Sequence, residues 1–401
     1  MISQKDKHII RELAKKQLEL ANSPKNRQIE KDWLLNNTFK PGRRPMIHIE
    51  MWTFENDVLP PYLKCEGEQA RNIEANIYRQ FLNQELFNDD RPIPDYHAVW
   101  WYTWFNLFGH DIKATHAKDS LGHKFEHIIN DLEDDYHKLG ASDFGLNRED
   151  SMKDAEKMHD LLGDILPIKY AADAFYAGPT QKVVHMMGME TMLMSIMDYP
   201  ELFKEMMNRI AEDQLAYFKF LEKENLLRPT TGLQQLAQGS WCYTDELPEG
   251  KYWGYLDSQE TVSISPQMYE EFIFPCYKKI ADHYGLLSYG CCEPVHSIWD
   301  NCLSKLPNLR KVSISPWCDE EFMGDKLRGK NVVFHRKPSP HFIGVDKVLD
   351  EDAVRAAFSK TIKAAQGCTL EIAQRDVYTI HGDVSKVKRY VEIIREEISN
   401  H

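Results

Sequence analysis

Residues 311–335 have the sequence KVSISPWCDEEFMGDKLRGKNVVFH, and this stretch decides the fold. It begins with Lys311–Ser315, a short run rich in β-branched side chains that predicts a strand. A charged segment at 319–327 with apolar residues at helical spacing follows. A second apolar run at 331–335 predicts another strand. A strand, a helix and a strand in this order form a unit whose two strands are parallel.

The same alternation extends in both directions along the chain. Further strands are expected at 45–52, 96–101, 169–175, 252–257, 286–291 and 369–373. Further helices are expected at 180–225 with a break at 198–200, from 265 onward, and at 294–305, 351–366 and 384–398. Neither the dinucleotide glycine fingerprint nor the P-loop pattern follows any of these strands. The sequence therefore predicts an α/β protein, a (β/α)8 TIM-type barrel rather than a doubly wound sheet.

Two regions differ from this alternation. Residues 1–40 have apolar positions at helical spacing and many charges, and Pro41 and Gly42 end this region. Residues 111–150 are polar and rich in Asp, His and Gly. We therefore expect an N-terminal helical extension over 1–40 and a single barrel over 41–401 that carries an insertion around 111–150.

Composition excludes several classes of partner. The 401 residues include 49 Lys and Arg against 62 Asp and Glu, a net charge of −13, which argues against nucleic-acid binding. No apolar run reaches the length of a membrane span, so we expect no membrane partner. The first twenty residues are too charged for a signal peptide, and the eight cysteines are scattered, so we expect a cytoplasmic protein with reduced thiols.

Active sites of such barrels lie at the carboxyl ends of the strands. The predicted strand ends carry polar and aromatic side chains suited to metal binding or catalysis. These are His48, Glu50, His97, Asp173, Asp257, Cys291, Cys292, Glu293, Trp317, Cys318, His335, Arg336, Lys337, Gln374, Arg375 and Asp376.

The adjacent Cys291 and Cys292, followed by Glu293, leave three interpretations open. Neighbouring side chains on a strand point in opposite directions, so both thiols reach one ion only where the chain turns, and Pro294 makes a turn plausible. A zinc site, a metal-free catalytic thiol, and ordinary burial of a free cysteine are all consistent with this pattern.

The charged and aromatic residues of the same region also have two interpretations each. His335 and Arg336 suit an anionic substrate or cofactor, or else a solvated loop. Trp52 and Trp317 suit a wall for a flat cofactor or a methylated ammonium group, or else core packing. His48 shares one strand face with Glu50 and is a further candidate for cofactor contact.

Three segments carry a resemblance to a known family. They are Gly188–Leu202 with its Asp-Tyr-Pro-Glu-Leu break, the segment SPQMYEEFIFPCYKKI at 265–280, and the strand, cysteine turn and helix at 286–300. They resemble the uroporphyrinogen decarboxylase superfamily, which includes the cobalamin-dependent methyltransferases. The resemblance implies a (β/α)8 barrel, and a homodimer would suit the family.

The resemblance is closer to the methyltransferase branch. True decarboxylases carry an Arg-rich segment after the first strand, whereas residues 48–55 here, HIEMWTFE, contain no Arg. Methyltransferases of the family resemble zinc enzymes with a His-x-Cys motif and a later Cys. Tyr289-Gly290-Cys291 stands at the first position and Asp376 at the second. The resemblance thus implies zinc held by Cys291, Cys292, Glu293 and Asp376.

The function implied is transfer of a methyl group between cobalamin and a small substrate or thiol acceptor. The corrinoid would be carried by a separate protein, because the chain lacks the Asp-x-His-x-x-Gly signature of corrinoid domains. The direction of methyl transfer stays open, and a methylated amine or an aryl ether is one candidate methyl donor. Catalytic roles fall to His335, Arg336, Tyr289 and Asp257, and cofactor contact to Trp317, Trp52 and His48. The alternative is a metal-free lyase similar to uroporphyrinogen decarboxylase, acting on a carboxylated substrate.

Overall fold

Seven parallel strands form the central sheet of the computed structural model, which describes residues 2–116, 123–171, 175–227, 235–236 and 238–401. Their order across the sheet is β1-β15-β14-β13-β12-β11-β8. The strands are β1 (Met46–Ile49), β8 (Phe175–Ala177), β11 (Trp253–Leu256), β12 (Leu286–Tyr289), β13 (Leu309–Ile314), β14 (Val333–Arg336) and β15 (Thr369–Gln374).

The remaining strands pair in twos. They are β2 (His97–Trp100) with β7 (Ile168–Ala171), β3 (Thr103–Asn106) with β6 (Asp143–Leu146), β4 (Ala114–His116) with β5 (His123–Phe125), and β9 (Gln235–Leu236) with β10 (Ser240–Trp241). Only the first of these pairs is parallel.

The chain also contains helices on the outside of the sheet. They are α1 (Gln4–Ala21), α2 (Pro24–Asn37), α3 (Glu68–Leu86), α4 (Leu132–Asp135), α5 (Arg148–Leu162), α6 (Pro179–Asp198), α7 (Pro200–Lys223), α8 (Pro266–Met268), α9 (Phe274–Ala281), α10 (Glu320–Leu327), α11 (His341–Gly344), α12 (Glu351–Ala364) and α13 (Val384–Asn400).

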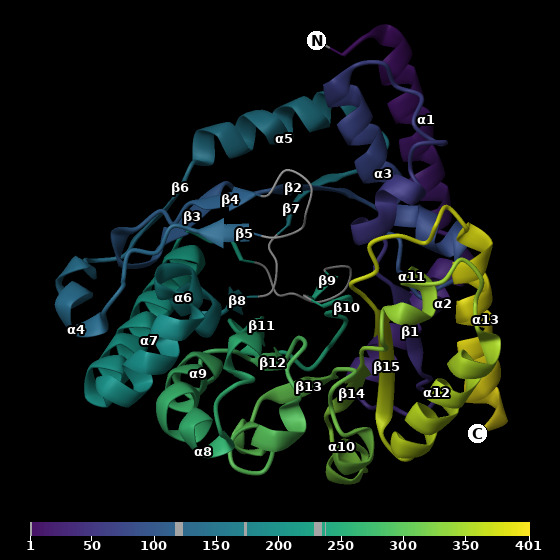
Figure 1. The fold of residues 1–401 in the computed structure, drawn as a ribbon. Helices are drawn as coiled ribbons and strands as arrows, with labels where there is room; N and C mark the ends of the chain where they lie inside the picture. The colour runs from purple at the N-terminus through teal and green to yellow at the C-terminus, as the bar shows by residue number, and fades with distance from the viewer. Residues whose placement is uncertain (1, 117–122, 172–174, 228–234, 237) are drawn as a thin grey trace.

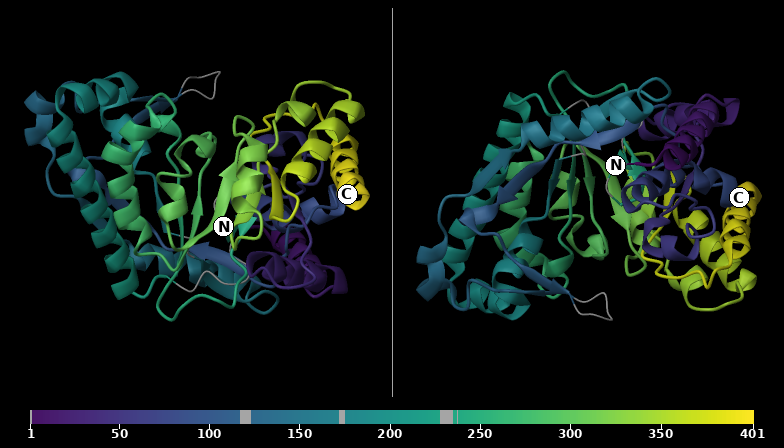
Figure 2. Two further views of the ribbon diagram at one scale, coloured as in Figure 1. Left: turned by 90° about the horizontal axis from the view of Figure 1, so that it is seen from below. Right: turned by 90° about the horizontal axis from the view of Figure 1, so that it is seen from above.

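The central sheet curves through an arc, with β2 and β7 across its open side (Figure 1). Helices such as α9, α10 and α12 lie outside the arc (Figures 1 and 2). Strand pairing among the described residues runs from β1 at one edge of the sheet to β8 at the other, and these two edge strands do not pair with each other. The α/β class with a large parallel sheet is therefore confirmed, and closure into an eight-stranded barrel stays a prediction.

The helical character predicted for residues 1–40 is confirmed, as two helices. The hydroxyl oxygen of Ser3 accepts a hydrogen bond from the backbone of Asp6 and begins α1. Ser23 begins α2 in the same way, and Pro24 occupies its first turn. Serine is favoured just before a helix because its hydroxyl oxygen satisfies an unpaired backbone N–H. Proline is favoured in the first turn because it has no N–H that needs a partner.

Three expected elements differ in the structure. The strand predicted at 169–175 corresponds to two strands, β7 and β8, which belong to different sheets, and 172–174 lies outside the described residues. The helix predicted from 265 contains a π-helical turn at Tyr269–Ile273, because Pro275 cannot donate a regular helical hydrogen bond. The helix predicted at 294–305 is replaced by two short 3-10 segments, Val295–Ile298 and Leu303–Lys305, separated by a turn at residues 299–302.

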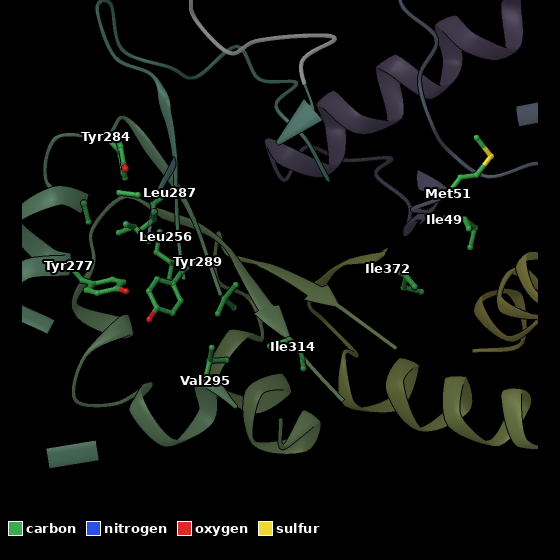
Figure 3. Packing of buried hydrophobic residues seen from close by; sticks show 14 of the residues in the cluster. Ile49, Met51, Leu256, Tyr277, Tyr284, Leu287, Tyr289, Val295, Ile314 and Ile372 are labelled. Carbon is green, nitrogen blue, oxygen red and sulfur yellow. The ribbon is translucent and has the colours of Figure 1, made fainter. Parts of the chain in front are cut away.

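A large apolar core lies between the sheet and its helices. Figure 3 shows Tyr289 of β12 beside Tyr277 of α9, with ring centroids 6.3 Å apart. Leu256 and Leu287 from neighbouring strands belong to the same cluster and are fully buried. This packing fixes β11 and β12 relative to α9 and so fixes the positions of the strand ends that follow.

A buried ion pair crosses the inner face of the sheet. Lys311 Nζ on β13 lies 2.8 Å from Glu371 Oε2 on β15, and both side chains are fully buried. The same ammonium group donates to the Ser240 hydroxyl at 2.6 Å and to the Trp241 carbonyl at 3.2 Å. His335 of β14 is paired in register with Glu371 and places its Nε2 3.6 Å from the Glu371 Oε1 atom.

Within the part of the chain that the structure describes, no helix combines the length and the apolar character that crossing a bilayer requires.

Replacing Glu371 with Ala should lower the free energy of unfolding by about 3–5 kcal/mol, because it leaves the Lys311 ammonium buried without its counter-charge. Urea unfolding of the wild type and the variant measures this change. The matched control is Asp282→Ala directly after α9, which removes an exposed i,i+4 pair with Lys278 and should cost less than about 0.5 kcal/mol. Equal effects of the two substitutions would contradict a central role for the buried pair.

Candidate active site

A tight turn follows β12 and places two thiols next to each other. Gly290 has φ = +101°, a conformation that other residues rarely adopt, and a Cβ there would lie 3.0 Å from the Cβ atom of Ser313. This turn brings the Sγ atoms of Cys291 and Cys292 to 3.6 Å. The turn anticipated before Pro294 therefore exists, and glycine makes it possible.

The Glu293 carboxylate holds this turn in place. Its Oε2 accepts the backbone N–H of Cys291 at 2.8 Å, and its Oε1 accepts the backbone N–H of Ser258 at 2.9 Å. The side chain is buried. Glu293 therefore joins the end of β12 to the end of β11, and both of its oxygens are engaged by backbone groups.

The two thiols have different acidities. The hydrogen bond that Cys291 donates to Cys292 raises the pKa of Cys291 and lowers the pKa of Cys292 to about 7. Lys337 and Arg375 also favour the Cys292 thiolate by their positive charge, whereas Asp376 opposes it. Cys292 is thus a substantially ionised thiol at neutral pH, which is the reactive form of cysteine.

Lys337 is buried among acceptors from two parts of the chain. Its Nζ donates to the Gly290 carbonyl at 3.2 Å, the Cys291 carbonyl at 3.1 Å and Gln238 Oε1 at 2.5 Å. Arg375 also donates to Gln238, and its Nε lies 2.9 Å from both carboxylate oxygens of Glu50. Both cations are therefore committed to protein groups.

Asp257, at the end of β11, is a buried carboxyl group. Burial raises its pKa to about 8, and the negative charge of Glu293 adds to this effect. The Tyr255 hydroxyl donates to Asp257 Oδ2 at 2.9 Å, and the exposed Tyr176 places its hydroxyl 3.5 Å from Oδ1. Asp257 is therefore predominantly protonated at neutral pH and can donate a proton.

A cavity of about 520 Å³ opens beside these groups. Its lining comprises Met189, Gln259, Glu260, Val262, Cys292, Pro294 and Trp317. The Trp317 side chain is 72% exposed, and burial raises the pKa of Glu260. These lining residues include no Lys, Arg or His, so they suit a neutral or cationic ligand better than a polyanion. Of the predicted site residues, Cys292 and Trp317 both line this cavity.

Three other predicted residues lie deeper and have structural partners. The Tyr289 hydroxyl is within 2.6 Å of both the Ser258 and the Tyr269 hydroxyls. Arg336 lies 2.7 Å from the Glu320 carboxylate and donates to the backbone carbonyls that follow β13. His335 is 1% exposed, and burial lowers its pKa far below the usual value, so it is neutral.

The remaining predicted positions are dispersed. His48 is buried in β1, with Nδ1 3.0 Å from Asp89 and its ring 4.6 Å from the centroid of Trp241. Trp52 is exposed on a 3-10 segment after β1, and His97 in β2 lines a separate groove against α3 and α5. Asp173 lies outside the described residues.

The proposed zinc ligands do not form a coordination set. Zinc takes three protein ligands in catalytic sites and four in structural ones. Among the described residues, no three His, Cys, Asp or Glu side chains are grouped so that they could hold a metal ion. Glu293 is turned toward backbone N–H groups, and Asp376, whose negative charge acts on Cys292, does not complete a set of three with Cys291 and Cys292. The residues present therefore do not fit a zinc site, and no chemical step is assigned to one.

Sequence reasoning missed Tyr176, Glu260 and Gln238. Tyr176 lies one residue beyond the strand predicted at 169–175, and Glu260 lies in a 3-10 segment after the strand at 252–257. Gln238 belongs to a long connection without a strand–helix pattern. A closer reading of the residues after each predicted strand could have found the first two.

Comparison with known proteins gives a structural match alone. No protein-family model matches the chain, and no curated protein matches it. A solved structure of a methyltransferase from Methanosarcina mazei is similar, with a TM-score of 0.53 and 11% sequence identity. The match covers 92% of this chain and 98% of that one. At this identity the match establishes a shared fold, which extends over nearly the whole chain.

The raised pKa of Asp257 should make stability depend on pH. The folded pKa of about 8 exceeds the ordinary value of 3.8, so the folded state binds more protons between these two values and loses stability as pH rises through that window, by up to about 1.4 kcal/mol per pH unit. Asp257→Asn should remove this loss, which denaturant unfolding at pH 5 and pH 8 measures. Tyr255→Phe should raise the carboxyl pKa further. A pH-independent difference between wild type and Asp257→Asn would contradict the assignment.

Alkylation should report the acidity of Cys292. We expect its rate of reaction with iodoacetamide to rise with pH around a midpoint near 7, followed by mass spectrometry of the 291–292 peptide. Cys291→Ala should raise this midpoint because it removes the S–H donor. Cys318→Ser, at a buried cysteine after β13, should leave the midpoint unchanged. A midpoint unaffected by Cys291→Ala would show that the thiol pair is not coupled.

Proposed function

We propose that the chain is a methyltransferase that moves a methyl group between a small methylated compound and a corrinoid carried by a separate protein. The observation that carries the proposal is a protonated carboxyl group, Asp257, close to a largely apolar cavity whose lining has no cationic side chain. The fold shared with a methyltransferase supports the same conclusion.

The proton donor suits removal of a methyl group from an ether or an amine. In that reaction the bond between carbon and oxygen or nitrogen breaks. An ether oxygen or a neutral amine nitrogen must take a proton as it leaves, whereas a quaternary ammonium group leaves as a neutral amine and needs none. The corrinoid, when bound, supplies the nucleophile that accepts the methyl group. Tyr176 lies between Asp257 and solvent, so its hydroxyl can give its proton to the leaving atom and take the proton of Asp257 in exchange.

The cavity would orient the methylated substrate. Trp317 and Val262 present exposed apolar surface at its edge, and Glu260 supplies one carboxyl group within it. A trimethylated ammonium group would gain cation–π attraction from the indole, and a methoxylated aromatic ring would gain apolar contact. The role of this chain is to fix the methyl group in line for transfer.

The surface around the strand ends suits a protein that delivers a corrinoid. Large apolar side chains are exposed in the segments that follow several strands of the sheet, where isolated surface positions are usually polar. They are Trp52 after β1, Val262 after β11, Trp317 after β13, Val345 and Val348 after β14, and Tyr378 after β15. Such residues can pack against the partner protein and the apolar edge of its macrocycle.

A metal-free carboxy-lyase is the second candidate, because a protonated Asp257 can also protonate a carbanion after loss of CO2. Binding a polycarboxylate would require free cations at the cavity. Arg336 and Arg375 are paired with Glu320 and Glu50, and Lys337 is buried among carbonyl oxygens and Gln238. These pairings favour methyl transfer over decarboxylation.

The test supplies free cob(I)alamin under anaerobic conditions as methyl acceptor, with 2-methoxyphenol and tetramethylammonium as donors. We expect one of the two to yield methylcob(III)alamin, followed by absorbance. With 2-methoxyphenol as donor, Asp257→Asn should lower kcat by roughly 10²–10⁴-fold, the usual contribution of a general acid, whereas tetramethylammonium needs no proton and its kcat should be unchanged. The donor that reacts identifies the leaving atom as oxygen or nitrogen.

Asp282→Asn is the matched control, since Asp282 is an exposed carboxyl group directly after α9, four residues before β12 and so near the amino ends of the strands, and its loss should leave kcat unchanged. Formation of methylcob(III)alamin from 2-methoxyphenol at the same rate by wild type and Asp257→Asn would contradict the role of Asp257. Absence of methyl transfer together with CO2 release from uroporphyrinogen would overturn the proposal in favour of the lyase.

A further inference from the structure

The turn after β12 presents two sulfur atoms with very different access. Cys291 is buried, whereas Cys292 is partly exposed and lines the cavity of about 520 Å³. Their Sγ atoms lie 3.6 Å apart. A reagent in the cavity therefore meets Cys292 first, with Cys291 directly behind it.

The backbone on the Cys291 side of this turn is held by hydrogen bonds. Glu293 accepts the Cys291 N–H, the Ser313 hydroxyl donates to the Cys291 carbonyl at 2.9 Å, and Lys337 donates to the carbonyls of Gly290 and Cys291. The two side chains are therefore kept next to each other, and closure of a bond between them would strain the peptide that joins them. A structural role for the pair would not require a cysteine at the cavity wall.

We propose that Cys291 and Cys292 form a metal-free redox dithiol that closes reversibly to a vicinal disulfide, with a small-molecule disulfide as its oxidant. The contact between the two sulfurs, the route to Cys292 through the cavity and the lack of a third metal donor carry this inference. It is independent of the proposed methyl transfer, because it concerns only the chemistry of the two thiols.

The reaction balances as two thiol–disulfide exchanges. Cys292 loses its proton and attacks one sulfur of the oxidant, which breaks the oxidant's S–S bond and releases one thiolate. Cys291 then loses its proton and attacks the Cys292 sulfur of the mixed disulfide, which releases the second thiolate. The two released thiolates take the two protons, so the protein dithiol is oxidised and the oxidant disulfide is reduced to two thiols.

Closure requires a short movement and yields a labile bond. A disulfide has an S–S length of about 2.05 Å, so the two sulfurs must approach by about 1.5 Å from their separation of 3.6 Å. Adjacent Cα atoms are about 3.8 Å apart, less than the roughly 4.4–6.8 Å usual for disulfides. The resulting ring is therefore strained and readily reduced, as a reversible redox site requires.

The experiment treats the reduced protein anaerobically with oxidised glutathione and measures intact mass and free thiols. In the wild type we expect the loss of two thiols and of two hydrogen masses, located to residues 291–292 by peptide mapping and reversed by dithiothreitol. Cys291→Ser should instead retain glutathione on Cys292, because the second exchange is blocked. Zinc content is measured on the same samples by elemental analysis.

Cys318→Ser is the control, since this buried cysteine follows the neighbouring strand and its loss should leave closure unchanged. A wild type that keeps a stable glutathione adduct on Cys292, or keeps both thiols, would overturn the proposal. So would about one zinc per chain whose removal is needed before the thiols oxidise. Methyl-transfer activity plays no part in these readouts, so failure here leaves the proposed function untouched.

Discussion

The buried pair between Lys311 and Glu371 is the constraint on which the interior of this protein depends. An ammonium group without water must find acceptors, and here they come from β15 and from Ser240 and Trp241 on a distant connection. The Lys311 charge also lies over the ring of Trp33 from α2, 5.4 Å from its centroid. The Lys311 ammonium group thus contacts the N-terminal helix α2, the sheet, and the connection that crosses the inner face of the sheet.

The site depends on a second set of buried polar contacts at the strand ends. Glu293 joins β11 to β12 through backbone N–H groups, and Lys337 joins β14 to the cysteine turn. Because both charges are satisfied by backbone atoms, neither is free for a ligand. The reactive groups that stay available are Cys292 and Asp257. The Cys291 hydrogen bond is the main cause of the lowered pKa of Cys292, and burial is the main cause of the raised pKa of Asp257; the charges of Lys337 and Glu293 add to these effects.

Periodicity along the chain predicted the five strands from β11 to β15 and the helices that follow β11, β13, β14 and β15, whereas the helix expected after β12 is replaced by two short 3-10 segments. It also placed Cys292, Trp317 and Asp257 at strand ends. It could not predict that Glu293 turns away from the thiols, since a carboxylate suits a metal and a backbone N–H equally well. Nor could it place Gln238, whose contacts with Lys337 and Arg375 join residues about 100 and 137 positions apart.

The connection that carries Ser240 and Trp241 also decides where chemistry can occur. Gly239 lies so close to His48 and Ala373 that even a methyl group there would be within about 3.3 Å of them, and the indole of Trp241 fills the space beside His48. These contacts fill the described part of the inner face beside His48. The cavity that Cys292 lines lies to one side, at the ends of β11, β12 and β13, so a ligand that enters it would meet an off-centre notch rather than an axial well.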